Sequence, residues 1–336
     1  MRILALTCLG ALVGAIGAGC SSPTAVGDAG ADQHRCPTCG DPQPCSICET
    51  ARPCVCTVAS QFGDLGRIAV ATDAAILVAD SGRHRIHRIV DGAVSTVAGS
   101  GGGGVEVGDA LTSAIGTPVG LAFLGGDVIF SDLGNRLLRV LTQNKVDILA
   151  GSAGGWNGPD GPERAASFFD PRGVAVGAGD EVFVADLRRV AMIANGDVST
   201  IQGTSGVLDV ASAANGALYL TGDNVVRVIR EGIVSTFAGD GKPGLRDGSV
   251  LSARFAGPSA LALDADGTLY VGESDNHTIR SIRNGQVTLE AGCGVRGFRD
   301  GPAATAMFGA IGGLAVSKNR ILLVSDGGTL RALYLN

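Results

Sequence analysis

Histidine and aromatic residues are scarce in this 336-residue sequence, which has four histidines, one tryptophan and an aromatic content of 4%. A zinc enzyme needs several histidines that converge on one site. Only His84, His87 and His277 follow the N-terminal region, and two of them belong to one expected strand. The chain also lacks a Gly-x-Ser-x-Gly nucleophile elbow between a strand and a helix. The sequence therefore argues against a histidine-bound zinc site and against a serine hydrolase of that type.

Blocks of like charge and long apolar runs are also missing from the body of the chain. The net charge is −6, and acidic and basic residues are interspersed throughout. This argues against a polyanionic partner, so no nucleic-acid binding is expected. After the first 19 residues, no stretch is apolar enough to span a bilayer.

The N-terminus has the composition of an export signal. Residues 1–19 begin with a basic residue and are otherwise almost wholly apolar, which predicts a signal peptide. Its last residues and the cysteine that follows, Gly17-Ala18-Gly19-Cys20, resemble a bacterial lipobox with glycine in place of the usual leucine. The resemblance implies lipidation of Cys20, and Ser21 after it implies the outer membrane of the cell envelope. A plain cleaved signal peptide is the alternative, and residues 20–35 are small and polar, as in a flexible tether.

One short phrase recurs along the chain and predicts its architecture. Its final glycines are 52, 52, 36 and 53 residues apart, and periods of roughly 40–50 residues built from short strands are typical of a β-propeller. First strands recur six times, so we predict an all-β, six-bladed propeller of four-stranded antiparallel blades. The copies of the phrase are Val94–Gly99, Val146–Gly151, Val198–Gly203, Val234–Gly239 and Val287–Gly292.

An N-terminal strand is expected to close the ring. The chain ends at Asn336, directly after the third strand of the sixth unit, Leu330–Leu333. The missing fourth strand stands at the other end, because Val55–Ser60 matches Val94–Gly99 almost position for position. Pairing this strand into the last blade would remove two exposed sheet edges.

The units resemble NHL repeats over residues 54–336. The resemblance is carried by Val78–Ile86 and Val271–Arg280, and by an Asp-Gly signature that follows three fourth strands at Asp160-Gly161, Asp247-Gly248 and Asp300-Gly301. It implies the propeller fold, but NHL propellers include peptide-amidating lyases, kinase sensor domains and binding scaffolds. The ligand site of such propellers normally lies on the face that carries the turns between second and third strands.

Candidate binding residues come from that face. A carboxylate recurs at the end of the second strands, and a ring of acids around a channel could bind calcium, which takes six to eight oxygen ligands. The alternative is that each acid accepts hydrogen bonds from its own turn. Trp156 could stack on a sugar or aromatic ligand, or it could instead hold its own loop in place. The candidate acids for binding are Asp80, Asp132, Asp186, Glu273 and Asp326.

Cysteines are concentrated in one short stretch. Six lie within 21 residues, in residues 36–53 and the start of the closing strand: Cys36, Cys39, Cys45, Cys48, Cys54 and Cys56. In an oxidising compartment such a stretch predicts three disulfides, with 15 connectivities open. Two Cys-x2-Cys pairs in a reducing compartment would instead suggest zinc or an iron–sulfur cluster.

Together these features predict an extracytoplasmic, membrane-anchored propeller that binds a protein, peptide or glycan of the cell envelope without catalysis. A monomer is expected, with no cofactor unless calcium binds at the acid ring. The alternative is a metal-dependent lyase or lactonase that uses calcium or zinc at the channel mouth. No histidine set or activated nucleophile stands out from the repeats, and this favours the binding module.

Overall fold

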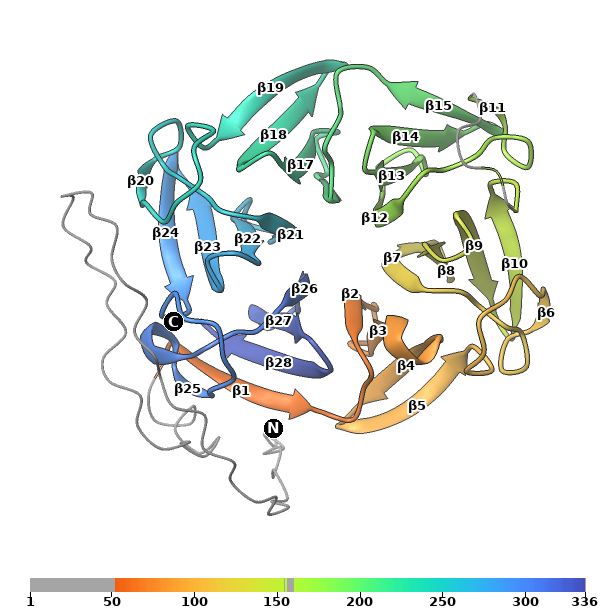
Figure 1. The fold of residues 1–336 in the computed structure, drawn as a ribbon, viewed down its shortest axis with the longest axis horizontal. Helices are drawn as coiled ribbons and strands as arrows, with labels where there is room; N and C mark the ends of the chain where they lie inside the picture. The colour runs from red at the N-terminus through yellow and green to blue at the C-terminus, as the bar shows by residue number, and fades with distance from the viewer. Residues whose placement is uncertain (1–51, 154, 156–159, 336) are drawn as a thin grey trace.

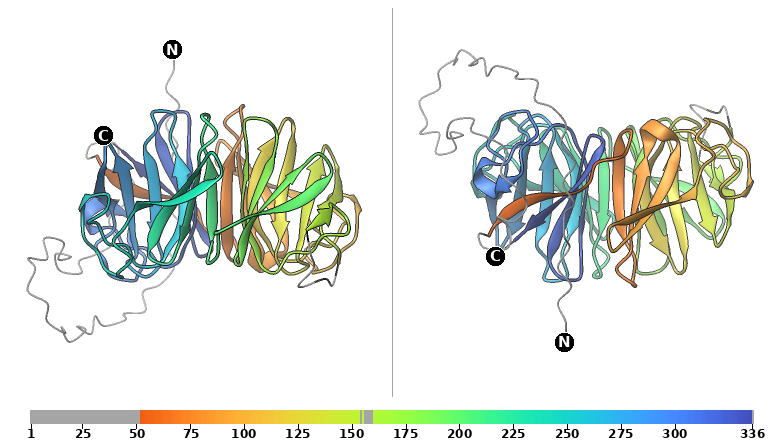
Figure 2. Two further views of the ribbon diagram at one scale, coloured as in Figure 1. Left: turned by 90° about the horizontal axis from the view of Figure 1, so that it is seen from above. Right: turned by 90° about the horizontal axis from the view of Figure 1, so that it is seen from below.

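The computed structural model describes residues 52–153, 155 and 160–335, which form a ring of six antiparallel sheets (Figure 1). The inner strands of the blades run roughly parallel to the ring axis, whereas the outermost strands are strongly inclined to it (Figures 1 and 2). The expected signal peptide, lipobox and tether, Cys36, Cys39, Cys45 and Cys48 of the cysteine-rich segment, and Trp156 lie outside the described residues.

The first three blades follow one another along the chain. Blade 1 contains β2 (Leu65–Val70), β3 (Ile76–Asp80), β4 (Arg85–Val90) and β5 (Ala93–Ala98), with the 3-10 turn η1 (Ser81–Arg83) between β3 and β4. Blade 2 contains β7 (Pro118–Leu124), β8 (Asp127–Asp132), β9 (Leu137–Thr142) and β10 (Lys145–Ala150). Blade 3 contains β12 (Pro171–Val176), β13 (Val182–Asp186), β14 (Arg189–Ala194) and β15 (Asp197–Ile201).

The remaining blades complete the ring. Blade 4 contains β16 (Asp209–Ser212), β17 (Leu218–Gly222), β18 (Val225–Arg230) and β19 (Ile233–Ala238). Blade 5 contains β21 (Pro258–Leu263), β22 (Leu269–Glu273), β23 (Thr278–Arg283) and β24 (Gln286–Ala291). Blade 6 contains β26 (Ile311–Val316), β27 (Ile321–Asp326), β28 (Thr329–Tyr334) and β1 (Cys54–Ala59) from the other end of the chain. The predicted six-bladed architecture is confirmed.

The N-terminal strand closes the ring as predicted. β1 pairs antiparallel with β28, with Cys54 opposite Tyr334 and Val55 opposite Leu333. Cys54 and Cys56 are both buried on this strand. The ring is also closed by packing, because one apolar cluster joins Leu323 of blade 6 to residues of blade 1 such as Ile68.

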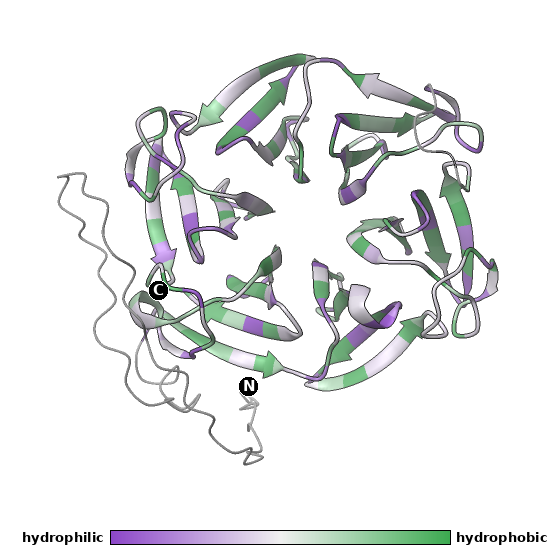
Figure 3. Cartoon of the chain, viewed as in Figure 1, coloured by the Kyte–Doolittle hydropathy of each residue, from purple (hydrophilic) through white to green (hydrophobic). Residues whose placement is uncertain are grey.

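Apolar residues gather between neighbouring blades. The strands second from the axis are covered on both sides, and β13 and β22 are buried along their whole length. Strands of this kind are expected to be almost continuously apolar, as Figure 3 shows for several inner strands. The outer strands β5 and β19 instead contain several exposed residues along their length. The core is therefore a series of inter-blade layers around the axis.

Four blades carry a fifth strand of two residues that the sequence did not predict. These are β6 (Gly108–Asp109), β11 (Gly161–Pro162), β20 (Gly248–Ser249) and β25 (Gly301–Pro302), each paired with the outermost strand of its blade. Each begins with a glycine at a φ between 122° and 145°, which residues with a side chain rarely adopt. The Asp-Gly signature thus covers a sheet edge, and a two-residue strand is too short to show alternation in the sequence.

Candidate functional site

One position of the repeat, on the innermost strand of each blade, differs between blades. Strand pairing aligns the residue just before Ile68, Leu121, Val174, Val210, Leu261 and Leu314. Four blades have a small residue there: Gly120, Gly173, Ala260 and Gly313. Blade 1 has Arg67 and blade 4 has Asp209, and these two blades lie on opposite sides of the ring (Figure 1).

The small residues are required by close packing around the axis. A Cβ atom on Gly120 would lie 2.1 Å from the carbonyl oxygen of Arg172, and one on Gly173 would lie 2.0 Å from Oδ1 of Asp209. No real side chain tolerates such distances. The inner strands therefore meet closely, and the larger side chains of blades 1 and 4 occupy the space that remains.

Arg67 crosses the axis and bonds to three other blades. Its Nε lies 3.0 Å from Oδ1 of Asp209. Its Nη2 donates to the carbonyl oxygens of Leu208 at 3.0 Å and Ser259 at 2.8 Å, and Nη1 donates to the carbonyl oxygen of Gly312. The opposite oxygen of Asp209 accepts the amide of Leu261 at 2.8 Å. One guanidinium thus ties blade 1 to blades 4, 5 and 6 and blocks the centre of the channel.

A cavity of about 320 Å³ lies over this crossing. All six blades contribute to its walls, which include Asp64, Thr117, Arg172, Leu208, Ser259 and Ile311. Ser81, Leu133 and Ser274, in the connections between second and third strands, also line it. This is the face on which the sequence placed the candidate site. We call this cavity the axial cup.

The charged side chains that line the axial cup differ in whether they already have a partner of opposite charge. Arg172 is held by Asp170 through Nε at 2.9 Å and Nη2 at 3.0 Å. Among the described residues, the carboxylate of Asp64 accepts no hydrogen bond and forms no ion pair. Partial burial, and then the nearby negative charge of Asp80, raise the pKa of Asp64. Asp64 is therefore the ionisable group of the cup that remains available.

The five candidate acids lie inside their own blades, and none of them lines the axial cup. All are 5% exposed or less. Each faces a basic side chain of the next strand: Asp80 and His87 at 3.4 Å, Asp132 and Arg139 at 3.3 Å, Asp186 and Arg189 at 3.3 Å, Glu273 and Arg280 at 3.3 Å, and Asp326 and Arg331 at 2.8 Å. Burial raises the pKa of Asp186, Glu273 and Asp326, and their arginines oppose this effect.

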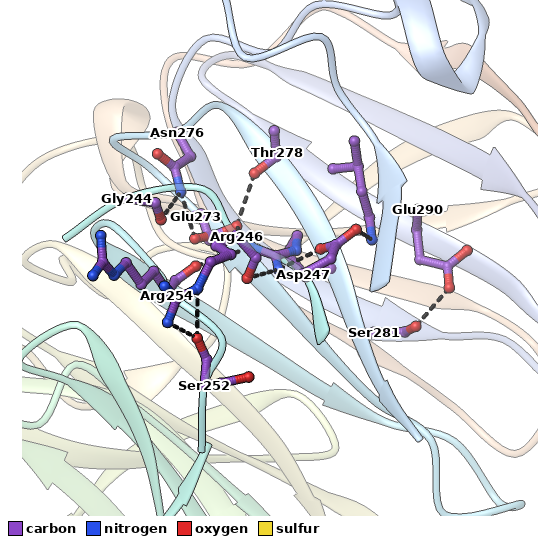
Figure 4. A network of polar contacts seen from close by, with 12 residues as sticks. Gly244, Arg246, Asp247, Ser252, Arg254, Glu273, Asn276, Thr278, Ser281 and Glu290 are labelled. Carbon is purple, nitrogen blue, oxygen red and sulfur yellow. Dashed lines mark hydrogen bonds and ion pairs between the residues drawn. The ribbon is translucent and has the colours of Figure 1, made fainter. Parts of the chain in front are cut away.

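Blade 5 shows how one such acid is held (Figure 4). The carboxylate of Glu273 accepts the amide of Ala256 at 3.0 Å, the side-chain amide of Asn276 at 2.7 Å and the hydroxyl of Thr278 at 2.8 Å. Arg280, fully buried, bridges Glu273 to Asp247 of the Asp-Gly signature. All of these partners belong to the blade itself or to the segment that enters it.

Two of the histidines contact a backbone carbonyl group in the segment that leads to the next blade. His84 and His277 follow the turns between second and third strands at φ 56° and 54°. Nδ1 of His277 bonds to the carbonyl oxygen of Gly309 at 2.7 Å, and His84 contacts the carbonyl of Gly116 in the same way. Each partner lies 32 residues further along the chain.

Sequence reasoning missed Arg67, Asp209 and Asp64. A signal for the first two was present, because an arginine and an aspartate replace small residues at one repeat position. Asp64 has no such signal in the sequence, because only the folded structure shows that its carboxylate has no hydrogen-bond or ionic partner among the described residues. Within the described residues, no group of three or more His, Cys, Asp or Glu side chains is placed to hold a metal ion. No helix in the same part of the chain is long and apolar enough to cross a membrane.

Comparison with known proteins supports the fold. No family model matches the chain. A stretch of 79 residues is 35% identical to Protein SUPPRESSOR OF QUENCHING 1, chloroplastic, of Arabidopsis thaliana; it is 22% of this chain but only 8% of that protein's length.

Solved structures match over most of the chain. An auxiliary nutrient binding protein from Bacteroides ovatus superposes with a TM-score of 0.63 at 17% identity, over 82% of this chain and 70% of that one. A gluconolactonase from Xanthomonas campestris superposes with a TM-score of 0.60 at 14% identity, over 89% and 96%. The neighbours are six-bladed propellers, and at these identities the likeness shows the fold alone.

Proposed function

We propose that this chain is an NHL-type propeller that binds a ligand in the axial cup without catalysis. The observation that carries the proposal is a cavity lined by all six blades above a floor closed by Arg67 and Asp209. Its volume is at the lower end of the range for small-molecule sites. The ligand is a small molecule, or the terminal unit of a peptide or glycan of the cell envelope.

The bonding of the cup agrees with a binding site. Arg67 and Arg172 are engaged by carboxylates, and the hydroxyls of Ser259 and Ser274 lie 2.6 Å apart. Groups held in this way give a rigid, preorganised surface. Similarity to a nutrient binding protein agrees with a binding role.

The N-terminal features complete this proposal. Export by the signal peptide, lipidation of Cys20 and a tether of residues 20–35 would place a monomeric propeller on the outer membrane, with disulfides in the cysteine-rich segment. A Cys20→Ser variant tests the anchor: it should be released from the membrane fraction, and retention there would contradict lipidation.

The second candidate is a metal-dependent lyase or lactonase at the same mouth. The available carboxylate of Asp64 favours this alternative, because an aspartate without a partner in the cavity can act as a general acid or base. Likeness to a gluconolactonase agrees with it at the level of the fold.

Ligand mapping on the full chain separates the two candidates. Peptides and glycans are screened for binding, and hydrogen exchange locates each one; the binding proposal expects protection at 64–67, 117–119 and 311–312. Lactone hydrolysis is assayed in parallel with added calcium or zinc. Turnover that requires the metal and is lost in Asp64→Asn would establish the enzyme instead.

A further inference from the structure

Arg67 lies at the base of the axial cup and is one of the residues that line it. Arg67 donates to the carbonyl oxygens of Leu208, Ser259 and Gly312, and it also faces Asp209. Its donors are therefore committed to the protein and are not available to an anion from solution.

Most of the remaining hydroxyl donors of the cup are committed as well, and Thr117 is the exception among the described lining residues. Arg172 is bound by both oxygens of Asp170. The hydroxyl of Ser81 donates to the carbonyl oxygen of Asp64 at 2.9 Å. Ser259 and Ser274 share a hydrogen bond, and each also lies within donating distance of the carbonyl oxygen of Ile311, at 3.1 and 3.4 Å. Apart from the Thr117 hydroxyl and the N–H groups of Arg172 that Asp170 does not accept, the side-chain donors of the walls are thus already engaged.

The net charge of the groups in and around the axial cup is negative. Arg67 is balanced by Asp209 and Arg172 is balanced by Asp170, which leaves the carboxylate of Asp64 uncompensated among the described residues. Asp80 lies behind it, and Oδ1 of Asp80 is 3.4 Å from the amide nitrogen of Asp64. The local potential therefore favours a positive charge and opposes a carboxylate or phosphate.

The geometry points to an organic ammonium group as the ligand of the axial cup, with the carboxylate of Asp64 as its counter-ion. A primary ammonium supplies three donors and one positive charge to an acceptor-rich site. Val119, Leu133 and Ile311 line the same cavity and contact the carbon skeleton. The inference rests on the proposed function and names the ligand class of that site.

The ammonium group could come from the amino terminus of a peptide or from an amino sugar. Calorimetry on the full chain compares triglycine with N-acetyltriglycine, and glucosamine with N-acetylglucosamine. We expect at least one free amine to bind about tenfold or more tightly than its acetylated partner, as charge-assisted hydrogen bonds are the strong ones. The pair that shows the difference identifies the source.

Two variants assign the effect to Asp64. In Asp64→Asn the preference for the free amine should disappear, and the fold should persist because this carboxylate makes no bond in the described structure. Asp73→Asn is the matched control, since Asp73 is an exposed carboxylate that pairs with Arg88 at 2.6 Å and does not line the cup.

Three results would overturn the inference: equal binding of amine and acetylated partner, an unchanged preference in Asp64→Asn, or no binding of any of the four probes. The proposed function fails separately. If acetylated or anionic compounds protect the cup from hydrogen exchange, the cup is a binding site and only the ligand class is wrong. If every bound compound maps elsewhere, the proposed function is wrong as well.

Discussion

Replacing Arg67 by methionine is expected to destabilise the propeller strongly. Methionine keeps the apolar stem but removes the guanidinium. Asp209 would then remain as a buried carboxylate, with its side chain 5% exposed and the amide of Leu261 as a remaining partner. Breaking a buried pair in this way costs about 3–5 kcal/mol. Three carbonyl oxygens also lose a donor, although water entering from the cup would replace part of this.

A double-mutant cycle isolates the pair. Asp209→Asn removes the buried charge, so the double variant Arg67→Met/Asp209→Asn should be more stable than Arg67→Met alone. We expect a coupling energy of about 2 kcal/mol or more between the two sites. The free energy of unfolding is measured by urea denaturation followed by circular dichroism. A loss below about 1 kcal/mol for Arg67→Met, or additive effects, would refute the structural role of this crossing.

Three further predictions concern packing, closure and pH. Gly173→Ala should cost about 1–3 kcal/mol by overpacking against Asp209, whereas Gly126→Ala, with open space around it, should change stability by less than about 0.5 kcal/mol; urea denaturation compares them. Asp300→Ala should lower hydrogen-exchange protection across β1, because Asp300 accepts the amide of Thr57 at 2.8 Å; unchanged protection would contradict this account of the closure. Burial alone would raise the pKa of Asp80, but hydrogen bonds from His87 and neighbouring amides lower the pKa overall. The ionised Asp80 therefore contributes its full stabilisation above about pH 4, and this contribution is lost as the pH falls through the pKa of Asp80 in the folded protein. Asp80→Asn should flatten the acid limb of the stability curve, and an identical acid limb would show that Asp80 does not control it.

The fold was predictable because every blade has the same physical requirement. Each fourth strand must pair with the third strand of its blade, and in five blades it is followed by a glycine, as in the phrase Val-Ser-Thr-Val-Ala-Gly of blade 1. The closing strand could be predicted for the same reason, because a segment near the N-terminus resembles the repeated phrase although it precedes the first blade. The two-residue strands were not predictable, because a strand of two residues leaves no alternation in the sequence.

The candidate site was less accessible to sequence reasoning. The binding site was predicted from acidic residues that recur in the repeats. In the structure, two of these residues, Asp132 and Glu273, form ion pairs within their own blades. Arg67 and Asp209 depart from the repeat, so a search for likeness passes over them. A comparison by repeat position, looking for the departures, would have found both. The free carboxylate of Asp64 depends on distances that only the folded chain defines.

A crystal structure of the full chain with triglycine tests the central claim most directly. The account predicts the peptide in the axial cup, with its ammonium group within hydrogen-bonding distance of the Asp64 carboxylate and Arg67 still bound to the carbonyls of Leu208 and Ser259. A peptide bound only at a blade edge, or an Arg67 withdrawn from the axis to leave an open channel, would contradict it.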